Sequence, residues 1–302
     1  MSAKLESKAL SEATFFGFLR RQFTKPKPLP ADIKLNNRVA IVTGSNVGIG
    51  LETSRQLLGL GLSHLVMGVR SQSKGDAAAA LLRTAFPSST ISVWLLDLES
   101  YDSVHAFAAQ CATLPRIDIT ILNSGMLAYS YTVSPTTKHE VMTQVNYLST
   151  ALLSYLLLPI LKAKRASGAA RPPVLTIVGS DGAYTGEVNT SGPVLSQFDQ
   201  PKGFKMLPRY YSSKLLLLFF FCKLAKLVSP DEVLVNMVNP GMTAGTAFSP
   251  SSAPVVLVKI FDLYKRLLAR PVAVAATIYI DAVVVRGKES HGSFLSDWAI
   301  KP

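Results

Sequence analysis

An apolar run followed by closely spaced glycines, residues 39–50 (VAIVTGSNVGIG), constrains this chain more than any other feature. Its first four residues are apolar and mostly β-branched, which predicts a fully buried strand. Gly44, Gly48 and Gly50 follow, and residues 51–60 favour a helix. A strand, a glycine-rich turn and a helix begin a βαβ unit that binds a dinucleotide. The pyrophosphate of such a ligand needs backbone N–H groups at close range and the positive end of a helix dipole.

Strand-like and helix-like segments alternate through the rest of the chain. Further strands are expected at 64–70, 91–98, 117–122, 174–178, 234–238 and 292–298, and further helices at 100–110, 138–161 and 210–228. This alternation predicts an α/β fold: a Rossmann-type, doubly wound parallel sheet in three α/β/α layers. The chain has 302 residues and is 48% hydrophobic, which suits one sizeable core. We expect a single NAD(P)-binding domain at 36–302, with a substrate lid at about 242–270.

The first 35 residues are interpreted as an N-terminal arm. It contains an aromatic cluster beside two arginines, and the proline-rich segment 25–30 (KPKPLP) then interrupts regular structure. We favour a short helix packed over the edge of the domain. Contact with a membrane surface is the alternative. The cluster comprises Phe15, Phe16, Phe18, Leu19 and Phe23, beside Arg20 and Arg21.

Composition excludes several classes of protein. The net charge is +12, but the basic residues are spread along the chain, which favours solvated helix faces over a nucleic-acid surface. Cys111 and Cys222 are interpreted as reduced core thiols, and the four histidines lack metal-ligand spacing, so we expect no metal. The longest apolar runs, 151–158 and 215–222, fall short of the roughly 20 residues that span a bilayer. No secretory signal is recognisable, so the expected location is the cytoplasm, with peripheral membrane association less favoured.

The residues after the second expected strand indicate the cofactor. Arg70 lies 20 residues after Gly50 (70 − 50), where an NAD-specific fold usually has an acidic residue for the ribose 2′-hydroxyl. Lys74 follows closely. Because a guanidinium suits a 2′-phosphate, NADP(H) is favoured over NAD(H).

Tyr210 and Lys214 stand four residues apart, which on a helix places both side chains on one face. A free tyrosine has a pKa near ~10, too high for ready proton exchange at neutral pH. A nearby ammonium favours the phenolate and lowers that pKa. The pair is therefore a candidate proton donor and acceptor. Tyr211, three residues before Lys214, is the alternative.

Taken together, these motifs resemble the short-chain dehydrogenase/reductase family from about residue 36 to 298. The matching elements are Thr43-Gly44-x-x-x-Gly48-x-Gly50, Asp97, Asn123-x-Gly125, Asn146, Ser180, Tyr210-x-x-x-Lys214 and Pro240-Gly241. The resemblance implies that Tyr210 exchanges a proton with the substrate oxygen and that Ser180 hydrogen-bonds that oxygen. It also implies that Lys214 lowers the pKa of Tyr210 and binds the nicotinamide ribose, while Asn146 holds a helix kink and a relay water.

The same resemblance implies a set of cofactor-binding residues. Thr243 and the backbone near Asn239 and Gly241 would hold the nicotinamide carboxamide. The full set is Gly44, Ser45, Asn46, Gly48, Ile49, Gly50, Arg70, Lys74, Asp97, Leu98, Asn123, Gly125, Tyr210, Lys214, Asn239, Gly241 and Thr243.

The expected substrate is a lipophilic or aromatic carbonyl compound or its alcohol, because apolar residues surround the expected site. They lie in the loop after Ser180, at Met126, Leu127, Tyr129 and Tyr131, and in 242–262. The long interval between Ser180 and Tyr210 resembles the retinol dehydrogenase-like branch and fungal reductases of secondary metabolism, and local phrases favour the latter. Alternatives are a retinoid- or steroid-type dehydrogenase at a membrane surface, and a non-catalytic NADP-sensing protein. A homodimer and a monomer both remain open.

Overall fold

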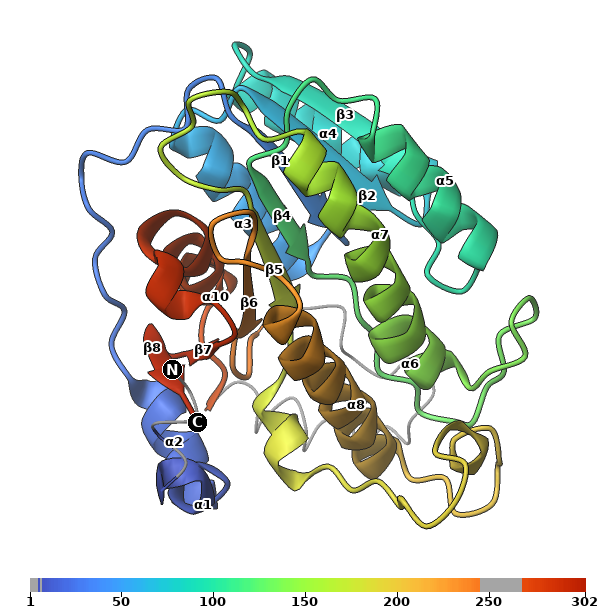
Figure 1. Ribbon diagram of the computed structural model, residues 1–302. Helices are drawn as coiled ribbons and strands as arrows, with labels where there is room; N and C mark the ends of the chain where they lie inside the picture. The colour runs from blue at the N-terminus through green and yellow to red at the C-terminus, as the bar shows by residue number, and fades with distance from the viewer. Residues whose placement is uncertain (1–4, 6, 245–267) are drawn as a thin grey trace.

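One eight-stranded sheet forms the centre of the computed structural model, which describes residues 5, 7–244 and 268–302 (Figure 1). The strand order is β3-β2-β1-β4-β5-β6-β7-β8. All neighbouring strands from β3 to β7 are parallel, and β8 pairs antiparallel with β7. The strands are β1 (Val39–Thr43), β2 (His64–Val69), β3 (Thr90–Leu95), β4 (Ile119–Leu122), β5 (Val174–Val178), β6 (Leu234–Asn239), β7 (Phe294–Ser296) and β8 (Ala299–Lys301).

Helices cover both faces of this sheet, as the alternating sequence predicts. One face packs on α5 (Tyr101–Cys111), α7 (Thr150–Ala163) and α8 (Met206–Lys226), and the other on α3 (Gly48–Gly59), α4 (Gln72–Ala85) and α10 (Val272–Ile280). Alternate residues of β1 enter opposite cores. Val39 and Ile41 belong to the first, and Ala40 and Val42 to the second. A central strand that is buried on both faces explains its unbroken apolar run.

The strand boundaries differ from expectation at several ends. β2 and β3 stop before Arg70 and Asp97, which leaves both residues in loops, and β4 begins at Ile119 rather than at residue 117. The run 292–298, expected as one strand, contains β7 and the turn of the β7–β8 hairpin, with Asp297 and Trp298 at positive φ in that turn. An antiparallel edge strand was not anticipated, because three residues are too few for a period-2 pattern.

The helix expected at 138–161 is interrupted. It comprises α6 (Val141–Thr143), a π-helical turn at Gln144–Ser149, and α7. α8 begins one turn before the expected residue 210. Short 3₁₀ turns lie at Asp181–Thr185, Leu195–Gln197 and Lys288–Ser290, and a second π-helical turn lies at Asp281–Val285.

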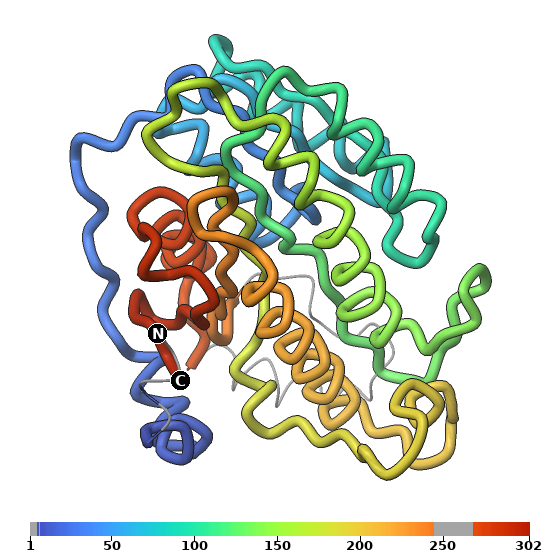
Figure 2. The backbone as a smooth tube through the Cα atoms, in the orientation of Figure 1, coloured from blue at the N-terminus to red at the C-terminus, as the bar shows by residue number. Residues whose placement is uncertain are grey.

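The N-terminal arm contains α1 (Ala9–Glu12) and α2 (Phe15–Phe23), so the favoured short helix is present. The arm contacts the edge strand β8, where Glu12 accepts from Lys301 at 3.4 Å, and α2 also contacts the segments after β5 and β6 through Asp181 and Met242. The connection to β1 then runs beside α10 along the length of the sheet (Figure 2). Leu10, Phe15, Phe16 and Phe23 of the arm are exposed.

The structure corrects one prediction about the cysteines and adds one observation about the apolar helices. Cys111 is buried as expected, but Cys222 lies on the exposed side of α8, so it is not a core thiol. Within the residues that the structure describes, one helical stretch, Val141–Ala163, is long and apolar enough to cross a membrane by length and composition. Over half of its most apolar window is buried inside the fold, as in the core helix of a globular protein.

Candidate active site

A cleft of about 540 Å³ opens at the carboxyl ends of the strands, between β1 and β4. The strand order reverses at this point, which is where open α/β sheets bind their ligands. Most of the predicted cofactor residues line it: Gly44, Asn46, Gly48, Ile49, Arg70, Lys74, Asp97, Leu98, Asn123 and Gly125. The cleft is also lined by Val47, Ser71, Leu96, Ser124 and Val145, which were absent from the predicted set.

The turn between β1 and α3 can accommodate only glycine at its key positions, because a side chain there would meet neighbouring atoms or require an unfavourable backbone conformation. Gly44 and Gly48 have positive φ, and a Cβ on Gly44 would lie 2.9 Å from the Ser124 hydroxyl. A Cβ on Gly50 would lie 2.5 Å from the carbonyl oxygen of Gly44. The amide of Asn123 donates to the Thr43 carbonyl at 2.9 Å and holds the turn from β4. This cradle at the N-terminus of α3 fits the pyrophosphate of a dinucleotide.

The far end of the cleft contains two cations, Arg70 and Lys74. Arg70 is largely exposed and pairs with Glu99 at 3.1 Å. Ser71 caps α4 by accepting from the backbone N–H of Lys74 at 3.5 Å, so the positive end of that helix faces the same region. The Asp97 carboxylate accepts from the backbone N–H of Glu99 at 3.0 Å. Two cations and a helix N-terminus are suited to a phosphate on the ribose.

Ser180, Tyr210 and Lys214 lie together beside the cleft and do not line it; a Cβ on the lining residue Gly125 would lie 3.5 Å from the Lys214 Nζ. Ser180 begins the 3₁₀ turn after β5, and its side chain is hydrogen-bonded to Tyr210. Lys214 is 4% exposed, donates to the Val178 carbonyl oxygen at 3.0 Å, and places its Nζ 5.9 Å from the centre of the Tyr210 ring. The fold therefore brings the three expected catalytic side chains into one cluster.

The electrostatics of this cluster differ from the simple expectation. Burial raises the pKa of Tyr210 to about 12, and the Ser180 hydrogen bond opposes part of that rise. Burial lowers the pKa of Lys214 to about 8, because the charged ammonium loses its hydration. Lys214 makes its hydrogen bond to the backbone rather than to the phenol, so desolvation outweighs the expected lowering of the Tyr210 pKa.

Tyr211 is held in a different place. Its ring packs on Gly182, where a Cβ would approach it within 2.4 Å, whereas Tyr210 reaches Ser180. The contact with Ser180 favours Tyr210 as the proton donor.

Asn146 lies on the π-helical turn and contacts the loop after β4. Its side chain accepts from the Met126 N–H at 2.8 Å and donates to the Met126 carbonyl at 2.9 Å and to the Ser213 hydroxyl at 3.1 Å. The extra residue of a π turn commonly marks a functional position. It directs Asn146 toward Gly125, whose added Cβ would lie 3.3 Å from the Asn146 oxygen.

The remaining predicted cofactor residues do not line the cleft: Ser45, Gly50, Tyr210, Lys214, Asn239, Gly241 and Thr243. Asn239 donates to Ser296 at 3.1 Å and accepts from the Gly241 N–H at 3.1 Å, and Thr243 donates to the Gly241 carbonyl at 3.1 Å. Ser45 is buried inside the turn. One supporting residue was missed: Tyr279 is fully buried on α10 and donates to the Asn123 oxygen at 3.2 Å. Its position in an apolar helix offered no sequence signal.

The expected substrate residues are only partly placed at the cleft. Met126, Leu127 and Tyr129 line it. Tyr131 packs edge-on against Phe204 instead, with ring centres 6.1 Å apart. Of the expected lid, residues 245–267 lie outside the described residues.

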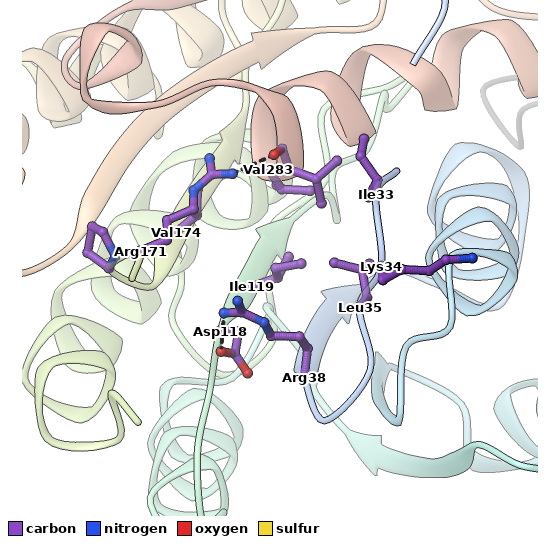
Figure 3. Close-up of a pocket in the computed structure, with 11 residues that line it drawn as sticks. Ile33, Lys34, Leu35, Arg38, Asp118, Ile119, Arg171, Val174 and Val283 are labelled. Atoms are coloured by element: carbon purple, nitrogen blue, oxygen red, sulfur yellow. Dashed lines mark hydrogen bonds and ion pairs between the residues drawn. The ribbon is translucent and has the colours of Figure 1, made fainter. Parts of the chain in front are cut away.

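A second cavity of about 210 Å³ lies at the opposite, amino end of β4 and β5 (Figure 3). Both of its arginines are engaged within the fold: Arg38 donates to Asp118 at 2.9 Å, and Arg171 donates to the Val284 carbonyl at 2.6 Å. We assign this cavity a structural role. Across the described parts of the chain, no group of three or more His, Cys, Asp or Glu residues is placed to hold a metal ion.

Known proteins resemble this chain in sequence and in fold. The family model described as short chain dehydrogenase matches residues 38–170. The short chain dehydrogenase virL of Hypocrea virens is 59% identical over all of this chain and 88% of its own length. The short chain dehydrogenase opdN of Penicillium oxalicum is 44% identical over the full length of both chains. Among solved structures, L-sorbose reductase from Gluconobacter frateurii, complexed with NADPH and L-sorbose, has a TM-score of 0.67 at 19% identity, covering 87% of this chain and 95% of its own.

The identity to the two fungal relatives extends over the whole of this chain. The chain belongs to the short chain dehydrogenase family and is an oxidoreductase.

Proposed function

We propose that this enzyme uses NADP(H) to interconvert a ketone or aldehyde and its alcohol on a lipophilic or aromatic small molecule. The observation that supports it most is the meeting of Ser180, Tyr210 and Lys214 beside a glycine-lined cleft. These three residues supply a hydrogen-bond donor, a proton donor and a cation, the groups that proton transfer to a carbonyl oxygen needs.

In the reductive direction, Tyr210 gives its proton to the carbonyl oxygen, and the Ser180 hydroxyl donates a hydrogen bond to the same oxygen. The bound dinucleotide supplies the hydride. Negative charge then remains on the Tyr210 oxygen, and the Lys214 ammonium stabilises it electrostatically. Asn146 holds the Met126 backbone on the other side of the site, which fixes the apolar wall against which the substrate packs.

NADP(H) is proposed over NAD(H) because Arg70, Lys74 and the N-terminus of α4 line one end of the cleft. The G. frateurii reductase, which shares the fold, was solved with NADPH. For the substrate, Met126, Leu127 and Tyr129 support an apolar carbonyl compound. The fungal origin of the 59% and 44% identical relatives supports a place in fungal secondary metabolism. The cytoplasm is the proposed location.

Titration of the purified protein with NADPH and NADH, followed by a carbonyl substrate screen, tests the proposal. We expect tighter binding of NADPH and its consumption with apolar aromatic or alicyclic ketones more readily than with sugars. Preference for NADH would contradict the role of Arg70. NADPH binding without turnover of any substrate in either direction would favour a non-catalytic, nucleotide-sensing protein.

A membrane-surface location is the second candidate, and the exposed arm residues favour it. Leu10, Phe16 and Phe23 are exposed beside Arg20, whose side chain is 63% exposed. An apolar and basic helical face of this kind binds anionic lipid surfaces. Flotation on vesicles containing phosphatidylserine, with a Phe16→Ser/Phe23→Ser variant as the control, separates a membrane-bound enzyme from a free one.

A further inference from the structure

The N-terminal arm contributes two buried polar side chains to the region beside the proposed active site. Arg21 is 4% exposed and Gln22 is 5% exposed, although both belong to the short surface helix α2. Each contacts a segment that the proposed function uses. Arg21 contacts the turn after Ser180, and Gln22 contacts the loop after β6.

Arg21 contacts the 3₁₀ turn Asp181–Thr185 through two of its residues. Its Nη2 donates to the Asp181 carboxylate at 3.0 Å, and its guanidinium lies 5.5 Å from the centre of the Tyr184 ring. Its Nη1 donates to the Glu12 carboxylate at 2.7 Å. Because Ser180 immediately precedes this turn and accepts from the Gly182 N–H at 3.1 Å, holding the turn also holds the serine hydroxyl.

Gln22 joins the two chain segments on either side of residues 245–267. Its amide nitrogen donates to the Met242 carbonyl at 2.7 Å and to the Leu268 carbonyl at 2.8 Å, and its oxygen accepts from the Met242 N–H at 3.0 Å. Arg270 donates to the carbonyl oxygens of Arg21 and Gln22 and so ties the end of α2 to the same place. The loop from Pro240 to Thr243 is therefore held by the arm.

Burying the Arg21 guanidinium and its carboxylate partners costs desolvation free energy, so a gain in stability alone does not account for this buried ion pair. A buried ion pair repays its desolvation only with good geometry, and apolar side chains of similar volume are often as stabilising. What a guanidinium bound to two carboxylates does provide is a fixed orientation of both. The carboxylate that it orients, Asp181, is adjacent to Ser180 in the chain.

We propose that Arg21 and Gln22 are positioning residues for the reaction: Arg21 sets the position of Ser180 through Asp181, and Gln22 sets the loop 240–243. This inference rests on the proposed function, since it assigns the arm to the same site. Neither residue touches the reacting atoms, so both act through the segments that they hold.

Arg21 also has an electrostatic consequence for Tyr210. The negative charge of Asp181 raises the pKa of Tyr210, and Arg21 offsets that charge. Loss of Arg21 should therefore move the pKa of Tyr210 further upward. In the described part of the chain, the charged and titratable groups around Arg21, Asp181 and Tyr210 are Glu12 of α1, Arg20 of α2, Tyr184 of the 3₁₀ turn, Lys301 and Asp297 of the β7–β8 hairpin, Arg270, Tyr211 and Lys214 of α8, and Tyr279 of α10.

The test uses the full chain with Arg21→Met, Gln22→Leu and the exposed arm control Lys25→Ala. For Arg21→Met we expect kcat to fall about 10-fold or more, with the Kd for NADPH changed less than about 3-fold, because the phosphates are held elsewhere. The alkaline-rising limb of alcohol oxidation should move to higher pH. Adding Asp181→Asn to Arg21→Met should bring that limb back toward the wild-type pH, a rescue that merely structural damage would not allow.

For Gln22→Leu we expect a similar fall in kcat without a pH shift, and for Lys25→Ala no change. Wild-type kcat and pH profile in both arm variants would overturn the proposal. If the wild-type enzyme turns over no substrate, the proposed function fails separately, and amide hydrogen exchange decides the role of the arm. Faster exchange at 181–185 in Arg21→Met and at 241–243 in Gln22→Leu would support positioning, and unchanged exchange would overturn it.

Discussion

Ser180 and Tyr210 share a side-chain hydrogen bond although they arise from different elements, the turn after β5 and the helix α8. The bond selects between two adjacent tyrosines. Tyr210 reaches the serine, whereas Tyr211 packs on Gly182. Since the serine hydroxyl and the acidic phenol must both approach one substrate oxygen, the pairing assigns the proposed proton transfer to Tyr210.

Replacing each tyrosine tests this assignment. Tyr210→Phe should lower kcat about 10²- to 10⁴-fold, the usual contribution of a positioned proton donor. Tyr211→Phe removes only a hydroxyl outside the proposed reaction and should keep kcat within a few-fold. Steady-state kinetics with matched thermal unfolding curves would measure both. The reverse order of effects would transfer the proposed role to Tyr211.

Removing Arg70 should weaken NADPH selectively. The loss of one charge-assisted contact costs about 1.5–3 kcal/mol, so Arg70→Ala should raise the Kd for NADPH about 10- to 100-fold and leave the Kd for NADH nearly unchanged. Arg55→Ala, on the exposed side of α3, changes the net charge equally and serves as the control. Equal weakening of both nucleotides by Arg70→Ala would argue against a 2′-phosphate contact.

Two glycines of α3 form a matched pair. A Cβ at Gly50 would lie 2.5 Å from the Gly44 carbonyl and 2.6 Å from the Asn123 amide, whereas a Cβ at Gly59 meets nothing within 4 Å. Gly50→Ala should therefore distort the turn and abolish nucleotide binding. Gly59→Ala should retain binding and leave stability unchanged or raise it by about 0.5 kcal/mol. Fluorescence titration and thermal unfolding would compare them, and normal binding by Gly50→Ala would contradict the cradle.

Lys214 should reduce stability at neutral pH. Burial lowers its pKa to about 8, whereas an unfolded lysine titrates near ~10.4. Between these two pKa values the unfolded state binds more protons than the folded state, so the free energy of unfolding rises with pH across that window. This gain in stability is lost as the pH falls through about 8, where the buried lysine becomes charged. Lys214→Met should therefore raise the free energy of unfolding at pH 7 by about 1–2 kcal/mol while abolishing activity.

The measurement for Lys214 is the difference in unfolding free energy between wild type and Lys214→Met at pH 7 and pH 10. We expect the advantage of the variant to shrink at the higher pH, where wild-type lysine is neutral in the fold. A difference independent of pH would show that lost packing, rather than charge burial, dominates the effect.

Much of the fold was predictable because its signals are local. The apolar run of β1 reflects a strand buried on both faces. In the glycine turn, Gly44 and Gly48 have positive φ, and a Cβ on Gly50 would collide with the Gly44 carbonyl oxygen. Tyr210 and Lys214 share a helical face by their separation alone. The structure departs from expectation at the hairpin of β7 and β8 and at the exposed Cys222, whereas the π turn at Asn146 lies where the family resemblance implies a helix kink.

The sequence by itself determined the alternation of strands and helices, the glycine turn and the residues available for chemistry, because each depends on neighbours a few positions apart. Tertiary structure alone decided that Arg21 meets Asp181, 160 residues away, and that Gln22 meets Met242, 220 residues away. It also set the pKa of Lys214 to about 8, against the value its residue type has in water. Such contacts and desolvation arise only when distant segments pack together, and no local pattern in the chain records them.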